Sequence, residues 1–304
     1  ASPPTTVSLT LSTDEESIKE NVRTFVEQVN DVRQTILDMT KVDEVSNEGS
    51  ILTGNYGVEN LVGQRLKDII ADLGIGFEFY NASTGEGDYY STLSQLGILT
   101  DAEESSPTRG LLLLDENKLS EALETNPDAV TELFAADYLG QSRSGDLSYD
   151  THVSGITEAG TYTVEYTSDG TQITSATIDG HAANVDGWTI TGASGHPEAG
   201  LSVTVTDHAS GTRSGDVSLK LGKTGELTDA LKQMTNSTDG PIFILEDNYE
   251  DIIDNIDKKI EREESRLDRM EQRLREKFAR LESLLGYYNS LGAEISSQMA
   301  QFSN

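Results

Sequence analysis

The chain has no cysteine, few basic residues and few apolar residues, and each shortage excludes a class of protein. Without cysteine there can be no disulfide framework, no thiol catalysis and no thiolate metal site. Acidic residues outnumber basic ones by 53 to 22, and the resulting net charge of −31 argues against binding nucleic acid or an anionic membrane surface. The hydrophobic share is 35%, whereas roughly half of the residues of a compact enzyme are usually apolar. We therefore expect an elongated protein with much of its length facing water.

Membrane spans and export signals are also missing from the sequence. No apolar run approaches the ~20 residues that cross a bilayer, and the start has no signal-peptide pattern. We expect no membrane partner. Any export would use a route that does not cleave such a signal, or a signal outside this sequence.

The residues that usually carry chemistry are scattered without a recognisable spacing. The four histidines, His152, His181, His196 and His208, match no metal-ligand pattern, which favours surface or loop positions. Asp-Gly pairs are frequent near them, but no twelve-residue loop has acids at alternate positions, so turns explain these pairs better than calcium binding does. No GxSxG, Walker or GxGxxG-helix pattern is present. We expect no catalytic residue, no cofactor and no metal ligand, and hence a protein that is not an enzyme.

The first regular element is a helix with a narrow apolar stripe. Ser12, Thr13 and Asp14 are candidate N-caps, and the acids that follow suit the positive end of the helix dipole. Apolar residues then recur in alternating steps of four and three, which is the coiled-coil period. They are Ile18, Val22, Phe25, Val29, Val32, Ile36 and Met39. The narrow stripe indicates a single partner helix.

A second, longer stripe follows the C-terminal part of the chain. A helix from Tyr249 to about Gln301 would span roughly 75 Å, against roughly 40 Å for the first helix. Its stripe consists of Ile253, Ile256, Ile260, Leu267, Met270, Leu274, Phe278, Leu281, Leu285, Tyr288, Leu291 and Ile295. We predict that the two stripes pair as an antiparallel coiled coil. The remainder of the longer stripe needs a further partner, either a segment that precedes this sequence or neighbouring copies.

Two stretches of different composition lie between the helices. Residues 42–136 predict a helix over 59–73, a short strand at 111–114, a helix from Asp115 and a further helical turn capped by Asn126. From about residue 137 to 222 the chain is rich in Gly, Thr, Ser and Asp, with β-branched residues. Strand patterns occur there at 161–166, 172–174, 176–178, 188–190 and 201–205, with Asp-Gly turn signals between them. This stretch indicates a small antiparallel β module inserted in a helical scaffold.

The patterns together predict an α+β, multi-domain protein. Long antiparallel coiled-coil helices would carry a mixed α/β leg domain and the inserted antiparallel β module. The expected domains are the end of a truncated β domain at 1–11, the first part of the leg at 12–136, the β module at 137–222, and a return segment with the coiled-coil helix of the leg at 223–304. The expected assembly residues are Ile18, Val22, Phe25, Val29, Val32 and Ile36 on the first helix and Ile253, Ile256, Ile260, Leu267, Met270, Leu274, Phe278 and Leu281 on the second.

Several short motifs, in this order along the chain, resemble those of the bacterial flagellar filament capping family, hook-associated protein 2. The motif LSQLGI at 93–98 is followed by residues 110–119, by NPDAV at 126–130, and by Leu133 and Phe134. The run RLREKFARLE at 273–282 is similar to the terminal helix of that family. The segment from 160 to 205 resembles a small β motif that is inserted in flagellin and hook-associated proteins.

This resemblance implies a secreted, extracellular protein at the distal tip of the bacterial flagellum. Members of the family form a homo-oligomeric ring on the growing filament, retain flagellin monomers, and promote their folding and insertion without bond chemistry. The implied partners are flagellin, other copies of the cap subunit, hook–filament junction proteins, and an export chaperone that engages the C-terminal residues 284–302. Neither nucleic acid nor a membrane is among them.

A function of a different class stays open at this point: a cell-surface adhesin or carbohydrate-binding module on a coiled-coil stalk. Trp188, Tyr162 and Tyr166 could form a platform for a sugar on the β module. Strand alternation suggests instead that some of these rings belong to the core. Glycan binding and cell adhesion would be compatible with a capping role, because the caps of some pathogens also adhere.

Overall fold

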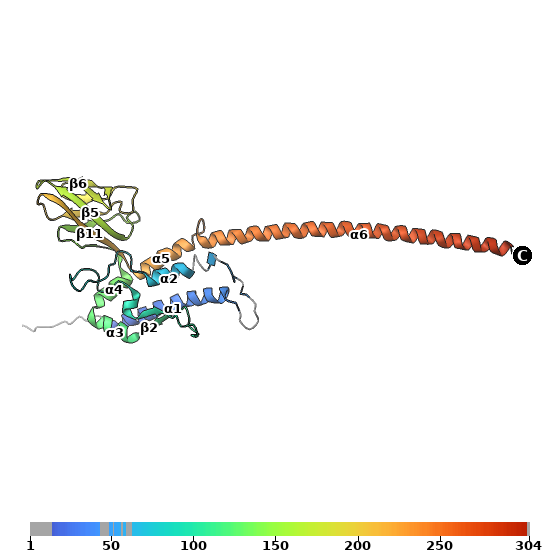
Figure 1. Cartoon of the computed structure of the whole chain (residues 1–304), viewed down its shortest axis with the longest axis horizontal. Coiled ribbons are helices and arrows are strands. Elements are labelled where there is room, and N and C mark those ends of the chain that lie inside the picture. The colour runs from blue at the N-terminus through green and yellow to red at the C-terminus, as the bar shows by residue number, and fades with distance from the viewer. Residues whose placement is uncertain (1–13, 43–48, 51, 56, 59–62, 303–304) are drawn as a thin grey trace, which may run out of the picture. The chain divides into compact units, whose positions relative to one another are not determined.

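The structure is a computed structural model that describes residues 14–42, 49–50, 52–55, 57–58 and 63–302. The chain divides into two compact units, Ala1–Pro241 and Ile242–Asn304. It contains helices and antiparallel sheets and ends in a long helix (Figure 1), so the α+β prediction is confirmed. The predicted end of a β domain at 1–11 lies outside the described residues.

The first helix, α1, spans Glu15–Thr40 and begins where the sequence predicts it. The carboxylate of Asp14 caps it by accepting a hydrogen bond from the backbone N–H of Ser17 at 3.1 Å. Its buried residues are Val22, Val26, Val29 and Arg33. This face is rotated from the predicted stripe, because Val26 and Arg33 take inward positions while Val32 stays 41% exposed. One side of α1 thus packs within its own unit, and one edge of the stripe faces outward.

Short helices and two paired strands pack around α1 in the first unit. They are α2 (Arg65–Ala71), the 3-10 helix η2 (Leu93–Leu96), β1 (Ile98–Thr100), β2 (Leu112–Leu114), α3 (Glu116–Thr125), α4 (Pro127–Ala135) and α5 (Lys223–Met234). Asp115 caps α3 and Asn126 caps α4, as the sequence predicts. The side chain of Asn30 exchanges two hydrogen bonds with the backbone of Leu112, at 2.7 and 2.9 Å, and so fixes β2 on the helix. Leucines of α3 and α4 complete the core beside the valines of α1.

The β module occupies residues 137–221 and consists of two antiparallel sheets. The five-stranded sheet has the order β3 (Asp137–Ser142), β11 (Gly211–Leu221), β5 (Gly160–Ser168), β6 (Ile173–Ile178), β7 (His181–Ala182). The four-stranded sheet has the order β4 (Leu147–Thr151), β10 (Ser202–Val205), β9 (Thr189–Thr191), β8 (Asn184–Asp186). Buried residues of both sheets, among them Val164, Ile178, Ile190 and Val203, form one cluster. The sheets therefore pack on each other as a sandwich.

The chain enters and leaves the β module through neighbouring strands. β3 pairs with β11, and Asp137 lies opposite Leu221. Next to this pair, the backbone N–H of Gly222 donates to the carbonyl of Ala136 at 2.7 Å. The module is consequently a closed insertion whose two ends meet at its base.

The C-terminal helix, α6, spans Pro241–Phe302 and accounts for almost all of the second unit. It starts at Pro241, earlier than the predicted start at Tyr249, and its 62 residues extend over roughly 90 Å. Proline suits the first turn of a helix because the N–H that it lacks would have no partner there. Within the part of the chain that the structure describes, no helix combines the length and apolarity that a bilayer crossing requires.

Several elements differ from the sequence predictions. Helices η2 and α5 and strands β1, β3, β4, β7, β8 and β11 were not predicted, and β6 is one strand where two were expected. The burial of β11 is continuous only in its last five positions, from Val217 onward, so its polar first half lacks a strand signal. In β6 a register shift opposite Ser168 places two exposed residues in succession and hides the alternation. Of the helix predicted over 59–73, α2 is the C-terminal part, and residues 59–62 lie outside the described residues.

Candidate assembly surface

The apolar stripe predicted for the C-terminal helix faces outward along α6. Its members, each between 43% and 68% exposed, are Ile253, Ile256, Ile260, Leu267, Met270, Leu274, Phe278 and Leu281. The second unit is a single helix, so no other element of that unit covers them. A long exposed apolar row of this kind is typical of a helix that binds another helix.

The ion pairs along α6 are exposed. Arg275 contacts Glu271 at 2.6 Å, with the acid four residues before the base, and Arg266 contacts Glu263 at 3.0 Å. Such solvent-exposed pairs contribute only about 0.3–0.5 kcal/mol each. The stabilisation of α6 by a partner must therefore come mainly from the stripe, where burying one leucine contributes roughly 1.5–3 kcal/mol.

The stripe predicted for the first helix is divided between the core and the surface. Val22 and Val29 are buried in the core, Ile18 and Phe25 pack partly against it, and Ile36 is half-buried. Along the outward edge, two apolar hollows of about 200 and 210 Å³ share the side chain of Phe25. Leucines of α2 and α5 line one, and residues of α4 line the other. Pairing of this edge with the C-terminal helix stays a prediction.

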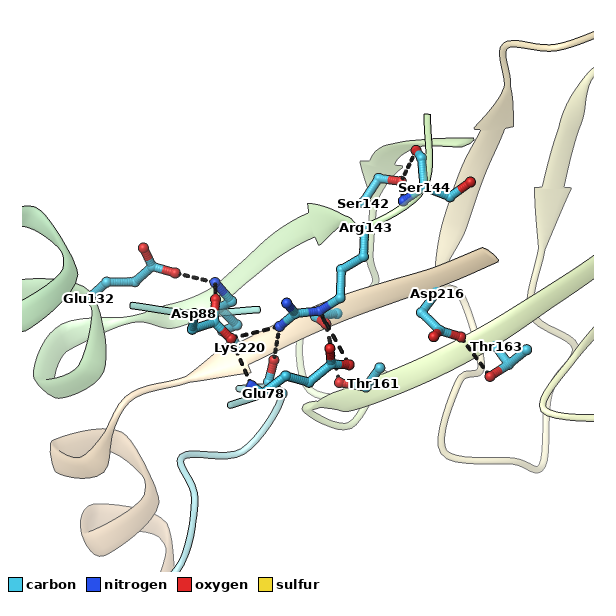
Figure 2. A network of polar contacts seen from close by, with 12 residues as sticks. Glu78, Asp88, Glu132, Ser142, Arg143, Ser144, Thr161, Thr163, Asp216 and Lys220 are labelled. Carbon is cyan, nitrogen blue, oxygen red and sulfur yellow. Dashed lines mark hydrogen bonds and ion pairs between the residues drawn. The ribbon is translucent and has the colours of Figure 1, made fainter. Parts of the chain in front are cut away.

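A network of buried charges joins the β module to the helical part of the first unit (Figure 2). Arg143, which follows β3, donates to Asp88 at 2.7 Å, and Lys220 of β11 donates to the other oxygen of the same carboxylate at 2.5 Å. Lys220 also pairs with Glu132 of α4, and Arg143 lies 3.4 Å from Glu78. Asp88 thus binds two cations from the module while its own loop, which also contains Glu78, belongs to the helical part.

The centre of this network is buried, whereas its outer carboxylates, Glu78 and Glu132, are 41% and 31% exposed. Lys220 is 1% exposed and Asp88 is 8% exposed. Burial alone would raise the pKa of Asp88, but the hydrogen bonds from Lys220 and Arg143 outweigh it and hold the pKa below its ordinary value. A buried charge that loses its partner is strongly destabilising, so the network ties the module to the helical part of the first unit.

A second buried lysine ties α5 to the end of α2. Lys223 is fully buried and donates to the backbone carbonyls of Ile69, in the last turn of α2, and of Leu73, just after the helix, at 2.6 and 3.0 Å. Its ammonium also contacts Glu226 at 2.9 Å. Burial nevertheless raises the pKa of Glu226, since the loss of hydration exceeds the attraction to Lys223.

Comparison with known proteins identifies the family of the chain. The family model described as the C-terminus of flagellar hook-associated protein 2 matches residues 1–290. The chain belongs to the flagellar hook-associated protein 2 family. The resemblance carried by the motifs at 93–98, 110–119 and 126–134 is thereby confirmed.

Two curated relatives bear the name of this family. The chain is 28% identical over 166 residues to the B-type flagellar hook-associated protein 2 of Pseudomonas aeruginosa, a match that covers 53% of this chain and 31% of the relative. It is 26% identical over 139 residues to the flagellar hook-associated protein 2 of Salmonella typhimurium, which covers 44% of this chain and 26% of the relative. The chain thus spans less than a third of either relative. No solved structure matches it significantly.

In this member of the hook-associated protein 2 family, the buried charges of Lys220 and Asp88 were not predicted from the sequence. A faint signal exists for Lys220, since it lies between Leu219 and Leu221 near the end of a stretch of strand. A lysine flanked by apolar residues in a strand is ordinarily an exposed residue, because alternation places it on the opposite face. Here β11 is covered on both faces near its end, so alternation fails and Lys220 is enclosed.

The aromatic platform required by the adhesin alternative is not formed. Tyr162 is 4% exposed and Tyr166 is 1% exposed, and both belong to the core of the β module. Trp188 is partly buried and stacks on His208 with the ring centres 3.9 Å apart. These three rings therefore cannot present a common flat surface to a sugar, as the strand alternation already suggested.

The histidines of this hook-associated protein 2 family member are not isolated from one another. His181 and His196 stack with their ring centres 3.7 Å apart, and Nδ1 of His181 contacts a carboxylate oxygen of Glu198 at 2.8 Å. Sequence spacing does not indicate this cluster, because His181 belongs to one sheet and the other two residues to the turn between strands of the other sheet.

Proposed function

We propose that the chain is part of a flagellar filament cap, a non-catalytic assembly factor at the distal tip of the extracellular flagellum. In this role it retains flagellin at the growing end and promotes its folding and insertion. Membership of the hook-associated protein 2 family and the printed names of the two relatives support the proposal. The single structural observation that carries it is the exposed apolar stripe of α6.

The stripe fits a structural role because it is long, regular and unpartnered within its unit. It belongs to a helix of 62 residues. We infer that it forms the coiled-coil leg of the cap, in part with the outward edge of α1, where Phe25 and Val32 lie, and in part with a preceding helical segment of the whole protein. Side-by-side legs from several copies would then form the homo-oligomeric ring.

The proposed partners follow from this arrangement. Flagellin and further cap subunits would meet the leg and the first unit, and hook–filament junction proteins would be neighbours during assembly. An export chaperone would engage the C-terminal residues 284–302 before secretion, since an exposed apolar helix end is a hazard for aggregation inside the cell.

Deletion of the gene tests the function. Cells without the protein are expected to keep their hooks, to lack filaments, and to release flagellin monomers into the medium, as measured by electron microscopy and by immunoblotting of the culture supernatant. Filaments of normal length in the deletion strain would refute the capping role.

Complementation then tests the stripe. The whole protein should restore filaments, whereas the same protein with Leu274→Asp and Phe278→Asp should not, because two charges interrupt the apolar row. The matched control is Gln272→Asp, which adds a charge on a polar face of the same helix turn and should restore filaments. Equal export of the three proteins, measured in the supernatant, separates a failure of capping from a failure of secretion.

A further inference from the structure

Three possible metal ligands from the two sheets of the β module lie close together. His181 is in β7, at the edge of the five-stranded sheet, whereas His196 and Glu198 lie between β9 and β10 of the four-stranded sheet. Each residue offers one ligand atom, and these atoms all lie within 4.8 Å of one another. The closest pair, Nδ1 of His181 and Oε1 of Glu198, is 2.8 Å apart.

The turn that carries His196 and Glu198 is held in shape by its own backbone. The carbonyl of Glu198 accepts the N–H of Leu201 at 2.9 Å, and the carbonyl of His196 accepts the N–H of Ala199 at 3.0 Å. A Cβ at Gly192 would lie 2.1 Å from the carbonyl oxygen of Glu198, so this close approach requires glycine. The two ligand candidates are therefore positioned by the fold and do not depend on a bound ion for their place.

The electrostatics of the cluster favour a cation. The side chain of Glu198 is 1% exposed, and its only ion-pair partner among the described residues is His181. Burial is the main cause that raises the pKa of the nearby Tyr162 hydroxyl, and the charges of Glu158, Glu198 and Asp179 raise it further. Glu198 is thus a buried carboxylate, which is costly without a positive partner.

We propose that His181, His196 and Glu198 bind a divalent transition-metal ion of the zinc type. Two imidazole nitrogens and one carboxylate oxygen suit Zn²⁺ and related ions, whereas Mg²⁺ and Ca²⁺ prefer oxygen ligands alone. Zinc ligands lie about 2.0–2.2 Å from the ion, which places tetrahedral ligand atoms about 3.4 Å apart. The His181–Glu198 separation must therefore widen slightly, and a water molecule would complete the four ligands.

Binding requires one ring to turn. The two imidazoles are stacked with an angle of 11° between their planes, and parallel rings cannot both direct an in-plane nitrogen at one ion. The side chain of His181 is 43% exposed and His196 is exposed, so both rings have room to rotate about the Cβ–Cγ bond. The ion would then tie the edge of one sheet to a turn of the other and stabilise the module.

Titration of the full chain with ZnCl₂ tests the site. Isothermal calorimetry in the presence of excess MgCl₂ is expected to show one Zn²⁺ bound per chain. Thermal unfolding followed by circular dichroism should show a higher unfolding temperature with Zn²⁺ than for the EDTA-treated protein. Co²⁺ in place of Zn²⁺ should give the visible absorption of a four-coordinate site. His196→Ala should weaken Zn²⁺ binding at least about tenfold and reduce the temperature rise.

Matched variants separate this site from weak binding to a surface of net charge −31. His152→Ala removes a histidine of the same module, outside the cluster, and should bind Zn²⁺ like the unaltered chain. Circular dichroism in EDTA verifies that each variant is folded, and His196→Gln replaces His196→Ala if that variant is not. Zn²⁺ binding that is absent, or that is equally strong in the His196 variant and the unaltered chain, would overturn the proposal.

Discussion

Helices α1 and α6 share an apolar period of alternating threes and fours, but the structure uses that period in two ways. In α1, Val22 and Val29 are 3% and 4% exposed and belong to the core of the first unit. In α6, Leu274 and Phe278 are 48% and 68% exposed, and the described residues of that unit form no second element. The period indicates that a helix has an apolar face, but it does not tell whether the partner is part of the same unit or another molecule.

The largest effect is expected from a charge placed in the core side of α1. Val22→Asp buries an unpaired carboxylate and should lower the free energy of unfolding by about 3–5 kcal/mol. Urea unfolding of the full chain, followed by circular dichroism and by Trp188 fluorescence, measures the change. An unchanged midpoint would mean that α1 is not part of the core and does not differ from α6 in this respect.

The same substitution on α6 is the matched control for this prediction. Leu274→Asp places the same charge at an equivalent point of the apolar period, but on a surface that is already in water. It should change the unfolding of the first unit by less than about 0.5 kcal/mol.

A second, smaller effect concerns the charges that join the β module to the helices. Lys220→Met removes the cation that Asp88 and Glu132 share and leaves Asp88 with Arg143. We expect a loss of about 3 kcal/mol in the free energy of unfolding. Lys232→Met is the control, since that lysine is 73% exposed and its pair with Asp229 is at the surface. Equal midpoints for the two variants would show that the network contributes nothing to stability.

The smallest effect is the dependence of stability on pH. The pKa of Asp88 is lowered in the folded chain, so its contribution is present above the ordinary value of 3.8 and is lost as the pH falls through the folded pKa. The pKa of Glu226 is raised by burial, so protonation of this group favours the fold as the pH falls. Asp88→Asn should flatten the loss of stability as the pH falls below 3.8, and Glu226→Gln should remove a gain of stability that develops as the pH falls toward 4.5. Urea midpoints over this range check both signs, and parallel curves for the two variants would contradict them.

Local signals explain which parts of the fold could be predicted. The caps Asp14, Asp115 and Asn126 and the apolar periods of both long helices lie within a few residues of the structure they specify. The buried charges could not be predicted in this way, because Lys220 and Asp88 are 132 residues apart in sequence. The same holds for His181 and Glu198, which are brought together by the packing of two sheets. β11 escaped prediction because its polar half is exposed while its apolar half is covered on both faces.

The base of the β module, where Ala136 and Gly222 share a hydrogen bond of 2.7 Å, has a practical meaning. An insertion with adjoining ends can be exchanged as a cassette, because a guest domain or a short turn needs to bridge almost no distance. Cutting there would also remove Arg143 and Lys220, so Asp88 would exchange its two cations for water and the scaffold would be left with an exposed, acidic docking point. Any graft that is meant to stand rigidly on this scaffold should therefore carry two positive side chains at its own base.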